Sequence, residues 1–222
     1  MNSPKRLYQF LLLVAAALAA GMVQAGDKHG IYAVTVTNLT RGTTITPLMV
    51  ATHKAGHIFT LGAMASPELS AIAEGGDIQP LSDKLLDSGM AYDVATNGAL
   101  LPPGESTTIM VKTDKAFPYV SVAAMLIPTN DGFVAVNGVK GPKHKGQVRA
   151  VMSPAYDAGS EPNDELCANI PGPVCGGEGL SADAGGEGYV HIHAGIHGIG
   201  NLDAASYDWR NPTARITIKR IK

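Results

Sequence analysis

The sequence predicts an all-β protein, an antiparallel β-sandwich with two short helices and one long loop rich in glycine and proline. Several segments alternate apolar and polar residues with a period of two, which is typical of half-buried strands. The chain has 26 glycines and 14 prolines among its 222 residues, which suits many turns and argues against a helical bundle. Hydrophobic residues make up 45% of the chain, too many for a disordered protein, and its length fits one domain.

The predicted strands follow the apolar pattern along the chain. Residues 31–37 and 214–219 alternate, so each is expected to bury one face. Residues 47–51 and 120–127 are apolar on both faces, as in central strands that are covered above and below. The remaining predicted strands are 106–113, 133–136, 148–152 and 189–193. Turn sequences separate them without a regular alternation with helices, which favours an antiparallel sandwich.

Two short helices are predicted between the strands. Ser66 followed by Pro67 fits an N-cap and a first helical position, and Gly75 is expected to end this helix. Its apolar face consists of Leu69, Ile72 and Ala73. Leu81 and Leu85 are four residues apart, so they share one face of the second helix.

The first part of the chain predicts export. Lys5 and Arg6 precede an apolar run at 11–20, and small residues suited to a signal peptidase follow it. We therefore interpret residues 1–25 as a secretory signal peptide and 26–222 as the mature domain. The run is shorter than the roughly 20 apolar residues of a membrane span, and no later stretch is long enough for a transmembrane segment. The mature protein is expected in a periplasm or outside the cell.

Cys167 and Cys175 are the two cysteines of the chain. They lie within a long loop, from about residue 154 to 188, whose prolines turn the chain back, so we expect a local disulfide in an oxidising compartment. A catalytic thiol or metal thiolates would be the functional alternative, but neither the spacing nor the neighbours match a zinc site.

Charge and motifs exclude several functions. The formal net charge of −2, which becomes more negative when Lys5 and Arg6 are removed, argues against nucleic-acid binding. Aromatic residues make up only 5%, so no stacking platform for bases or sugars is evident. The chain has no nucleophile elbow, zinc-protease motif, phosphate-binding loop or dinucleotide fingerprint. We therefore do not expect an enzyme.

The strongest local chemistry is a set of acidic residues at strand ends. Asp131 follows the central strand 120–127, and Asp157 and Glu161 lie where another strand leaves the sandwich. Three carboxylates gathered at one end would repel one another unless a divalent cation lay between them, and oxygen ligands favour calcium. The backbone carbonyl of Tyr156 and waters would complete the shell. The alternative is that these acids lie in solvated turns without a metal.

Three segments resemble the spondin amino-terminal domain family. They are 125–134, which includes the turn after the central strand, 156–161, and the closing strand 214–221. The resemblance extends from about Ile31 to Ile221. This family includes an animal extracellular-matrix adhesion protein and bacterial secreted members. It implies an antiparallel β-sandwich similar to calcium-dependent membrane-binding domains, with calcium at one end.

The family's calcium ligands correspond to Asp131, Asp157 and Glu161. The last position is aspartate in the animal proteins, and glutamate is one methylene longer, so its coordination differs in reach. An aromatic residue follows the first aspartate in animal members, whereas this chain has Gly132 and then Phe133. The resemblance thus implies a secreted, non-catalytic calcium-binding module for adhesion or interaction. Its partner would be an extracellular protein, a glycan or a surface ligand.

A second hypothesis rests on histidines. His191 and His193 would point to the same face of a strand, and a turn at Gly195 would return His197 to that face. Three imidazoles suit Zn²⁺ or Cu²⁺, so the alternative function is a periplasmic transition-metal binder or a metalloenzyme. Histidines beside glycines also hydrogen-bond the backbone and pack loops together, which is the purely structural interpretation.

Overall fold

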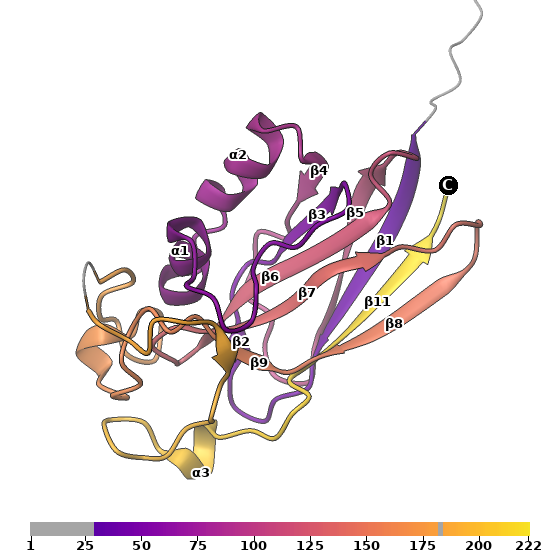
Figure 1. Cartoon of the computed structure of the whole chain (residues 1–222). Coiled ribbons are helices and arrows are strands. Elements are labelled where there is room, and N and C mark those ends of the chain that lie inside the picture. The colour runs from indigo at the N-terminus through magenta and orange to yellow at the C-terminus, as the bar shows by residue number, and fades with distance from the viewer. Residues whose placement is uncertain (1–28, 182–183) are drawn as a thin grey trace, which may run out of the picture.

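The protein is a sandwich of two antiparallel sheets, as the computed structural model shows for residues 29–181 and 184–222 (Figure 1). This confirms the predicted all-β sandwich. The expected signal peptide, 1–25, lies outside the described residues. Within the described part of the chain, no helix has both the length and the apolar character needed to cross a membrane.

The smaller sheet has four strands in the order β5-β1-β11-β8. Their bounds are β1 (Gly30–Asn38), β5 (Ser106–Thr113), β8 (Val148–Ser153) and β11 (Ala214–Arg220). The alternating residues of β1 and β11 bury one face, as predicted: Val34 and Val36 of β1 and Ile216 and Ile218 of β11 are all in the core. The other face of this sheet is half-buried or exposed.

The larger sheet has seven strands. Six follow the order β10-β9-β7-β6-β3-β4, and β2 pairs with β6. Their bounds are β2 (Thr44–Ile45), β3 (Met49–His53), β4 (Ala91–Ala95), β6 (Tyr119–Ile127), β7 (Gly132–Lys140), β9 (Ala155–Asp157) and β10 (His191–Ile192). Strand β6 is buried on both faces, because one face meets the smaller sheet and the other is covered by helices.

The helices α1 (Pro67–Gly75) and α2 (Gln79–Asp87) lie against the outer face of the larger sheet (Figure 1). The Ser66 side chain accepts a hydrogen bond from the backbone N–H of Leu69, as expected for an N-cap. The helix ends at Gly75, as predicted, and the next residue, Gly76, adopts the left-handed conformation that closes it. Two further short elements are η1 (Cys167–Asn169) and α3 (Ala204–Tyr207).

The two ends of the sandwich differ in charge. At one end lie the turn between β6 and β7, the end of β9 and the start of β10, and this acidic end holds Asp131 and Asp157. At the opposite end β1 begins, β7 ends at Lys140 and β11 ends at Arg220, and this is the basic end. In Figure 1 the acidic end lies below and the basic end above and to the right.

Candidate metal centre

Strand pairing brings Asp131 and Asp157 together. Gly132, the first residue of β7, pairs with Asp157, the last residue of β9, so the two aspartates lie at neighbouring strand ends. On its other side β9 pairs with β10, which places His191 opposite Asp157. Both aspartates are fully buried. Residues from three distant parts of the sequence therefore meet at the acidic end.

Asp131 has one oxygen that is held by hydrogen bonds and one that is not. Its Oδ2 accepts hydrogen bonds from the backbone N–H groups of Ser160 at 2.8 Å and Glu161 at 3.1 Å. Its Oδ1 is buried and has no hydrogen-bond partner in the described part of the chain. Burial raises the pKa of Asp131 to about 7, and the charge of Asp157 adds to the rise. This carboxyl group therefore needs a proton or a cation to offset its burial.

Asp157 is fixed by its own loop. Its Oδ1 accepts a hydrogen bond from the Gly159 N–H at 2.8 Å, and its Oδ2 accepts one from the Asn163 amide at 2.7 Å. Gly159 has a φ of +66°, and a Cβ there would lie 2.4 Å from the Tyr189 carbonyl oxygen. Only glycine fits this close approach between the loop after β9 and the segment before β10.

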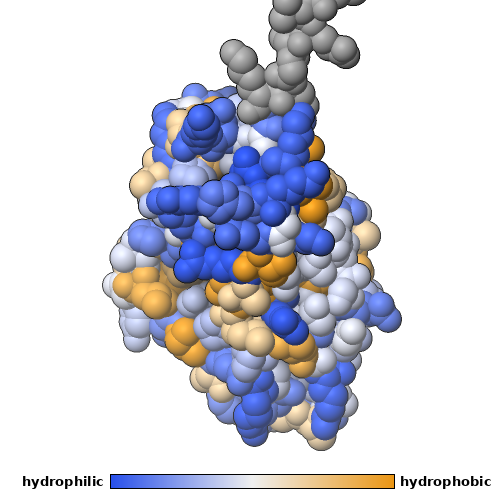
Figure 2. Space-filling view, turned by 90° about the vertical axis from the view of Figure 1, so that its right-hand side faces the viewer, coloured by the Kyte–Doolittle hydropathy of each residue, from blue (hydrophilic) through white to orange (hydrophobic). Residues whose placement is uncertain are grey.

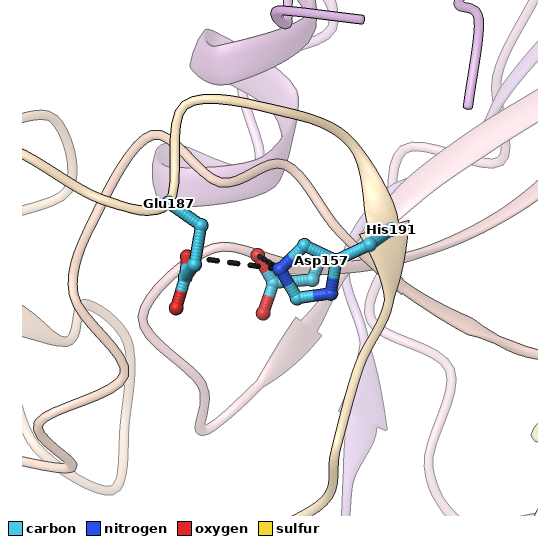
Figure 3. Close-up of side chains that lie close together, drawn as sticks. All are labelled: Asp157, Glu187 and His191. Carbon is cyan, nitrogen blue, oxygen red and sulfur yellow. Dashed lines mark ion pairs between the residues drawn. The ribbon is translucent and has the colours of Figure 1, made fainter. Parts of the chain in front are cut away.

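Glu187 and His191 complete a cluster with Asp157 (Figure 3). His191 Nε2 lies 3.5 Å from an Asp157 oxygen and 3.7 Å from a Glu187 oxygen, and the three ligand atoms lie within 4.8 Å of one another. His191 Nδ1 is 3.0 Å from the Ile192 carbonyl, which only accepts, so Nδ1 carries the proton. In the neutral ring the lone pair is therefore on Nε2 and faces the two carboxylates, which is the arrangement of a metal ligand.

His193 has the opposite tautomer. Its Nδ1 accepts a hydrogen bond from the Gly195 N–H at 3.0 Å, so in the neutral ring the proton lies on Nε2. Burial lowers the pKa of His193, which favours that neutral ring. Nε2 is 4.0 Å from Asp157 Oδ2 and has no hydrogen-bond partner among the described residues. His193 is thus arranged to donate toward Asp157 rather than to bind a metal.

His197 does not join the other two histidines at this cluster. Its side chain is exposed, and its Nδ1 lies 3.8 Å from Glu165. Glu165 is buried, and its carboxylate accepts hydrogen bonds from the backbone N–H groups of Gly198 at 2.7 Å and Ile199 at 3.0 Å. These contacts show that Glu165 fixes the loop after His193, a role that the sequence analysis missed.

Glu161 donates its backbone N–H to Asp131, and its side chain is buried. Burial raises the pKa of Glu161 to about 7, and the charges that add to the rise are those of Glu74 and Asp164. Neither oxygen of Glu161 accepts a hydrogen bond from residues 29–181 or 184–222. The charge of Glu74 of α1 thus acts on Glu161, Glu187 is an acid beside Asp157, and the predicted calcium ligand at Glu161 stays a prediction.

Tyr156 lies within the sheet. It pairs with Phe133 of β7 and Ile192 of β10, and its ring stacks on the Phe133 ring with 5.4 Å between the centroids. Backbone carbonyls of a central strand serve the hydrogen-bond ladder first. The predicted carbonyl ligand at Tyr156 stays a prediction.

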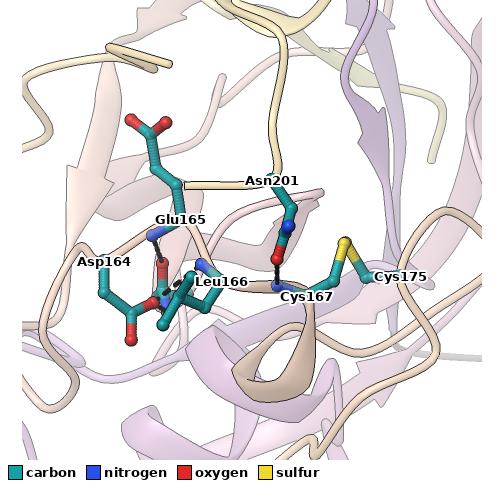
Figure 4. The surroundings of a disulfide bond; sticks show 7 residues. Asp164, Glu165, Leu166, Cys167, Cys175 and Asn201 are labelled. Atoms are coloured by element: carbon teal, nitrogen blue, oxygen red, sulfur yellow. Dashed lines mark hydrogen bonds between the residues drawn. A yellow bond between two sulfur atoms is a disulfide. The ribbon is translucent and has the colours of Figure 1, made fainter. Parts of the chain in front are cut away.

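The Cys167–Cys175 disulfide is formed, which confirms that prediction (Figure 4). The Cys167 N–H donates to the Asn201 side chain at 2.9 Å, so the bridge is also tied to the segment before α3. Just before it, Asp164 accepts a hydrogen bond from the side chain of Asn130, at 2.9 Å. Because Asn130 precedes Asp131, the disulfide loop supports the wall of the candidate metal centre.

Comparison with known proteins identifies the family of this chain. A search among curated proteins found no match to this chain. The family model described as Spondin_N matches residues 38–161, which is more than half of the chain. The matched region includes Asp131, Asp157 and Glu161 and ends before Glu187 and His191. The chain belongs to the Spondin_N family.

Proposed function

We propose that this protein is an exported, non-catalytic module for adhesion or interaction, whose loops at the acidic end are ordered by calcium. The family and the disulfide fit an extracellular or secreted protein. The observation that carries the proposal is the unpartnered, buried Oδ1 of Asp131 beside the equally buried Asp157. A divalent cation would bind both carboxylates and offset their repulsion.

Oxygen donors at this end favour calcium. Calcium takes about six to eight oxygen ligands and accepts irregular arrangements. Asp131 and Asp157 are the first two ligands, Glu187 is within reach of Asp157, and backbone carbonyls and water would supply the rest. Such an ion would join the turn after β6, the loop after β9 and the segment before β10. These loops would then present a fixed surface to an extracellular protein, a glycan or another surface ligand.

A transition metal is the second candidate, and one observation favours it. The Nε2 lone pair of His191 faces Asp157 and Glu187, and this set of one imidazole and two carboxylates suits Zn²⁺. The set differs from the three histidines expected from the sequence, because Asp157 and Glu187 accompany His191 in place of His193 and His197. Both candidates use Asp157, so they would compete for one place.

Metal titration separates the two candidates. The protein is purified without a polyhistidine tag and stripped with EDTA, and its melting temperature is followed during titration with Ca²⁺ or Zn²⁺. At a calcium concentration of 100 times Kd, mass action is expected to add about 2.7 kcal/mol of stability. Asp131→Asn and Asp157→Asn should each abolish most of this gain. The matched control is Asp93→Asn on β4, where the aspartate accepts a hydrogen bond from the Lys112 N–H.

His191→Gln distinguishes the metals. If calcium is the ion, this variant keeps most of the calcium effect. If zinc is the ion, zinc binds with one-to-one stoichiometry and the variant loses it. A melting curve that neither ion shifts would overturn the proposed metal dependence, and the acids would then be ordinary polar turns.

A further inference from the structure

The basic end contains a pocket that is separate from the candidate metal centre. The pocket has a volume of about 390 Å³, within the range of ligand sites, and lies where β1 begins and β7 and β11 end. Its positively charged lining residues are Lys115, Lys140, Lys143 and Arg220, and Asp114 is its single acidic lining residue. Figure 2, which views the sandwich from the side of β8 and β11, shows hydrophilic side chains crowded over the upper part of this face. The pocket thus concentrates positive charge in a chain whose formal net charge is −2.

Aromatic rings, not carboxylates, hold two of these cations. The Arg220 guanidinium lies 5.0 Å from the centroid of the Tyr32 ring, and the Lys140 ammonium lies 5.9 Å from that of Tyr119. Within the part of the chain that the structure describes, none of the four cations forms an ion pair with an acidic side chain. Their N–H groups are therefore available to an anion that enters the pocket.

The walls of the pocket are fixed before any ligand binds. The buried Tyr32 donates its hydroxyl to the Pro142 carbonyl at 3.1 Å, and the Gly141 N–H donates to the Pro118 carbonyl at 2.8 Å. A Cβ on Gly141 would lie 2.5 Å from the Tyr32 ring, so the ring rests directly on this turn. Arg220 is held through its backbone as well, since its carbonyl accepts a hydrogen bond from the Gly146 N–H at 2.8 Å. Such preorganisation reduces the entropy lost on binding.

We propose that this pocket binds a sulfate or phosphate ester carried by an extracellular polysaccharide. The tetrahedral oxyanion of such an ester matches several converging N–H donors, of which the Arg220 guanidinium offers a bidentate pair. Two more cations, Lys145 and Arg149, lie on the same turn and the adjacent strand, and Arg149 donates to the Lys140 carbonyl at 2.8 Å. Positive charge that continues beyond the pocket suits a polymer with repeated anions. None of the lining residues is an exposed large hydrophobic side chain, which disfavours a lipid surface as the ligand.

Binding of a heparin-derived octasaccharide tests the proposal. Calorimetric titration of the whole purified protein in low salt and EDTA is expected to show binding that weakens as salt is added, because counterions are released. Arg220→Gln should weaken binding at least tenfold. Lys84→Gln is the matched control, since Lys84 is paired with Glu68 between α2 and α1, and this variant should change the affinity less than twofold.

Two further variants keep the test valid if Arg220→Gln fails to fold. Lys143 is exposed, so Lys143→Gln should leave the melting temperature unchanged and weaken binding at least threefold. Gly30→Ala keeps every charge but places a Cβ 1.9 Å from Arg220 Nη2, which would move the guanidinium off Tyr32. It should also weaken binding at least threefold, whereas affinity that depends only on net charge would not change.

Three results would overturn the proposal. The first is that the octasaccharide does not bind, or binds all the variants equally well. The second is binding to phosphatidylglycerol vesicles, with phosphatidylcholine vesicles as the blank, but not to the octasaccharide. The third is complete displacement of the octasaccharide by 1 mol equivalent of inorganic phosphate, which would make the ligand a free anion. Calcium plays no part in the assay, so failure here is distinct from failure at the acidic end.

Discussion

The two ends of the sandwich handle charge in opposite ways. At the acidic end Asp131, Asp157 and Glu161 are buried, and atoms of Asp131 and Glu161 lack hydrogen-bond partners among the described residues. At the basic end Lys143 is exposed and Arg220 rests on an aromatic ring. Buried charge is costly without a counterion, whereas exposed charge is solvated and costs little. We therefore expect a cation to stabilise the acidic end, whereas the basic end is held by contacts within the chain.

Matched glycine substitutions give the largest expected contrast between the two ends. Gly159→Ala at the acidic end meets both a φ of +66° and the Tyr189 carbonyl at 2.4 Å, so we expect the free energy of unfolding to fall by about 3 kcal/mol or more. Gly146→Ala at the basic end meets only its φ of +83°, with no atom within 4 Å, and should cost about 1–2 kcal/mol. Urea denaturation measures both. Equal losses would contradict the contrast in packing.

Removal of the disulfide tests the support of the acidic end. Replacing Cys167 and Cys175 by serine opens a short loop and should reduce the free energy of unfolding by about 2–3 kcal/mol. The loss should be accompanied by weaker metal binding, because Asp164 beside this loop is hydrogen-bonded to Asn130. Octasaccharide binding at the basic end should be unchanged. Weakened binding at both ends would indicate a general loss of structure.

The smallest expected difference between the two ends is in how their charged groups make stability depend on pH. Burial raises the pKa of Asp131 and Glu161 to about 7, above their values in the unfolded chain. The folded state therefore holds more protons, so without metal the free energy of unfolding should fall as pH rises from about 4.5 to about 7. Glu161→Gln should flatten this slope. Lys143→Gln serves as the control, and a slope that Glu161→Gln leaves unchanged would contradict the role of burial.

The sequence predicted the strands with strong periodicity and missed those without it. Residues 106–113 form β5 with the predicted bounds, because alternation on an edge strand is easy to read. Strand β4, Ala91–Ala95, was missed, since its residues are mixed in polarity and its burial does not alternate. The end of α1 at Gly75 was predicted, but the left-handed conformation of the next residue, Gly76, was not, because either glycine can adopt it.

The candidate site, too, was predictable from the sequence only in part. Reasoning from strand ends was sufficient to expect Asp131 and Asp157 at one end of the sandwich, and strand pairing places them side by side. Glu187 lies in a glycine-rich segment without periodicity, so its position beside Asp157 depends on the folded loop. The roles of His191 and His193 depend on single backbone contacts, the Ile192 carbonyl and the Gly195 N–H. Sequence spacing carries no information on such contacts.

The position of β11 in the smaller sheet affects how the chain folds. Strand β11 lies between β1 and β8, and its register pairs Tyr32 with Arg220 across almost the whole chain (Figure 1). The smaller sheet is therefore incomplete until the last strand arrives, and partners so distant in sequence make for slow folding. Until then Val34 and Val36 have no neighbour on that side to shield them from water. We therefore expect the smaller sheet to close only after Ala214–Arg220 has been synthesised.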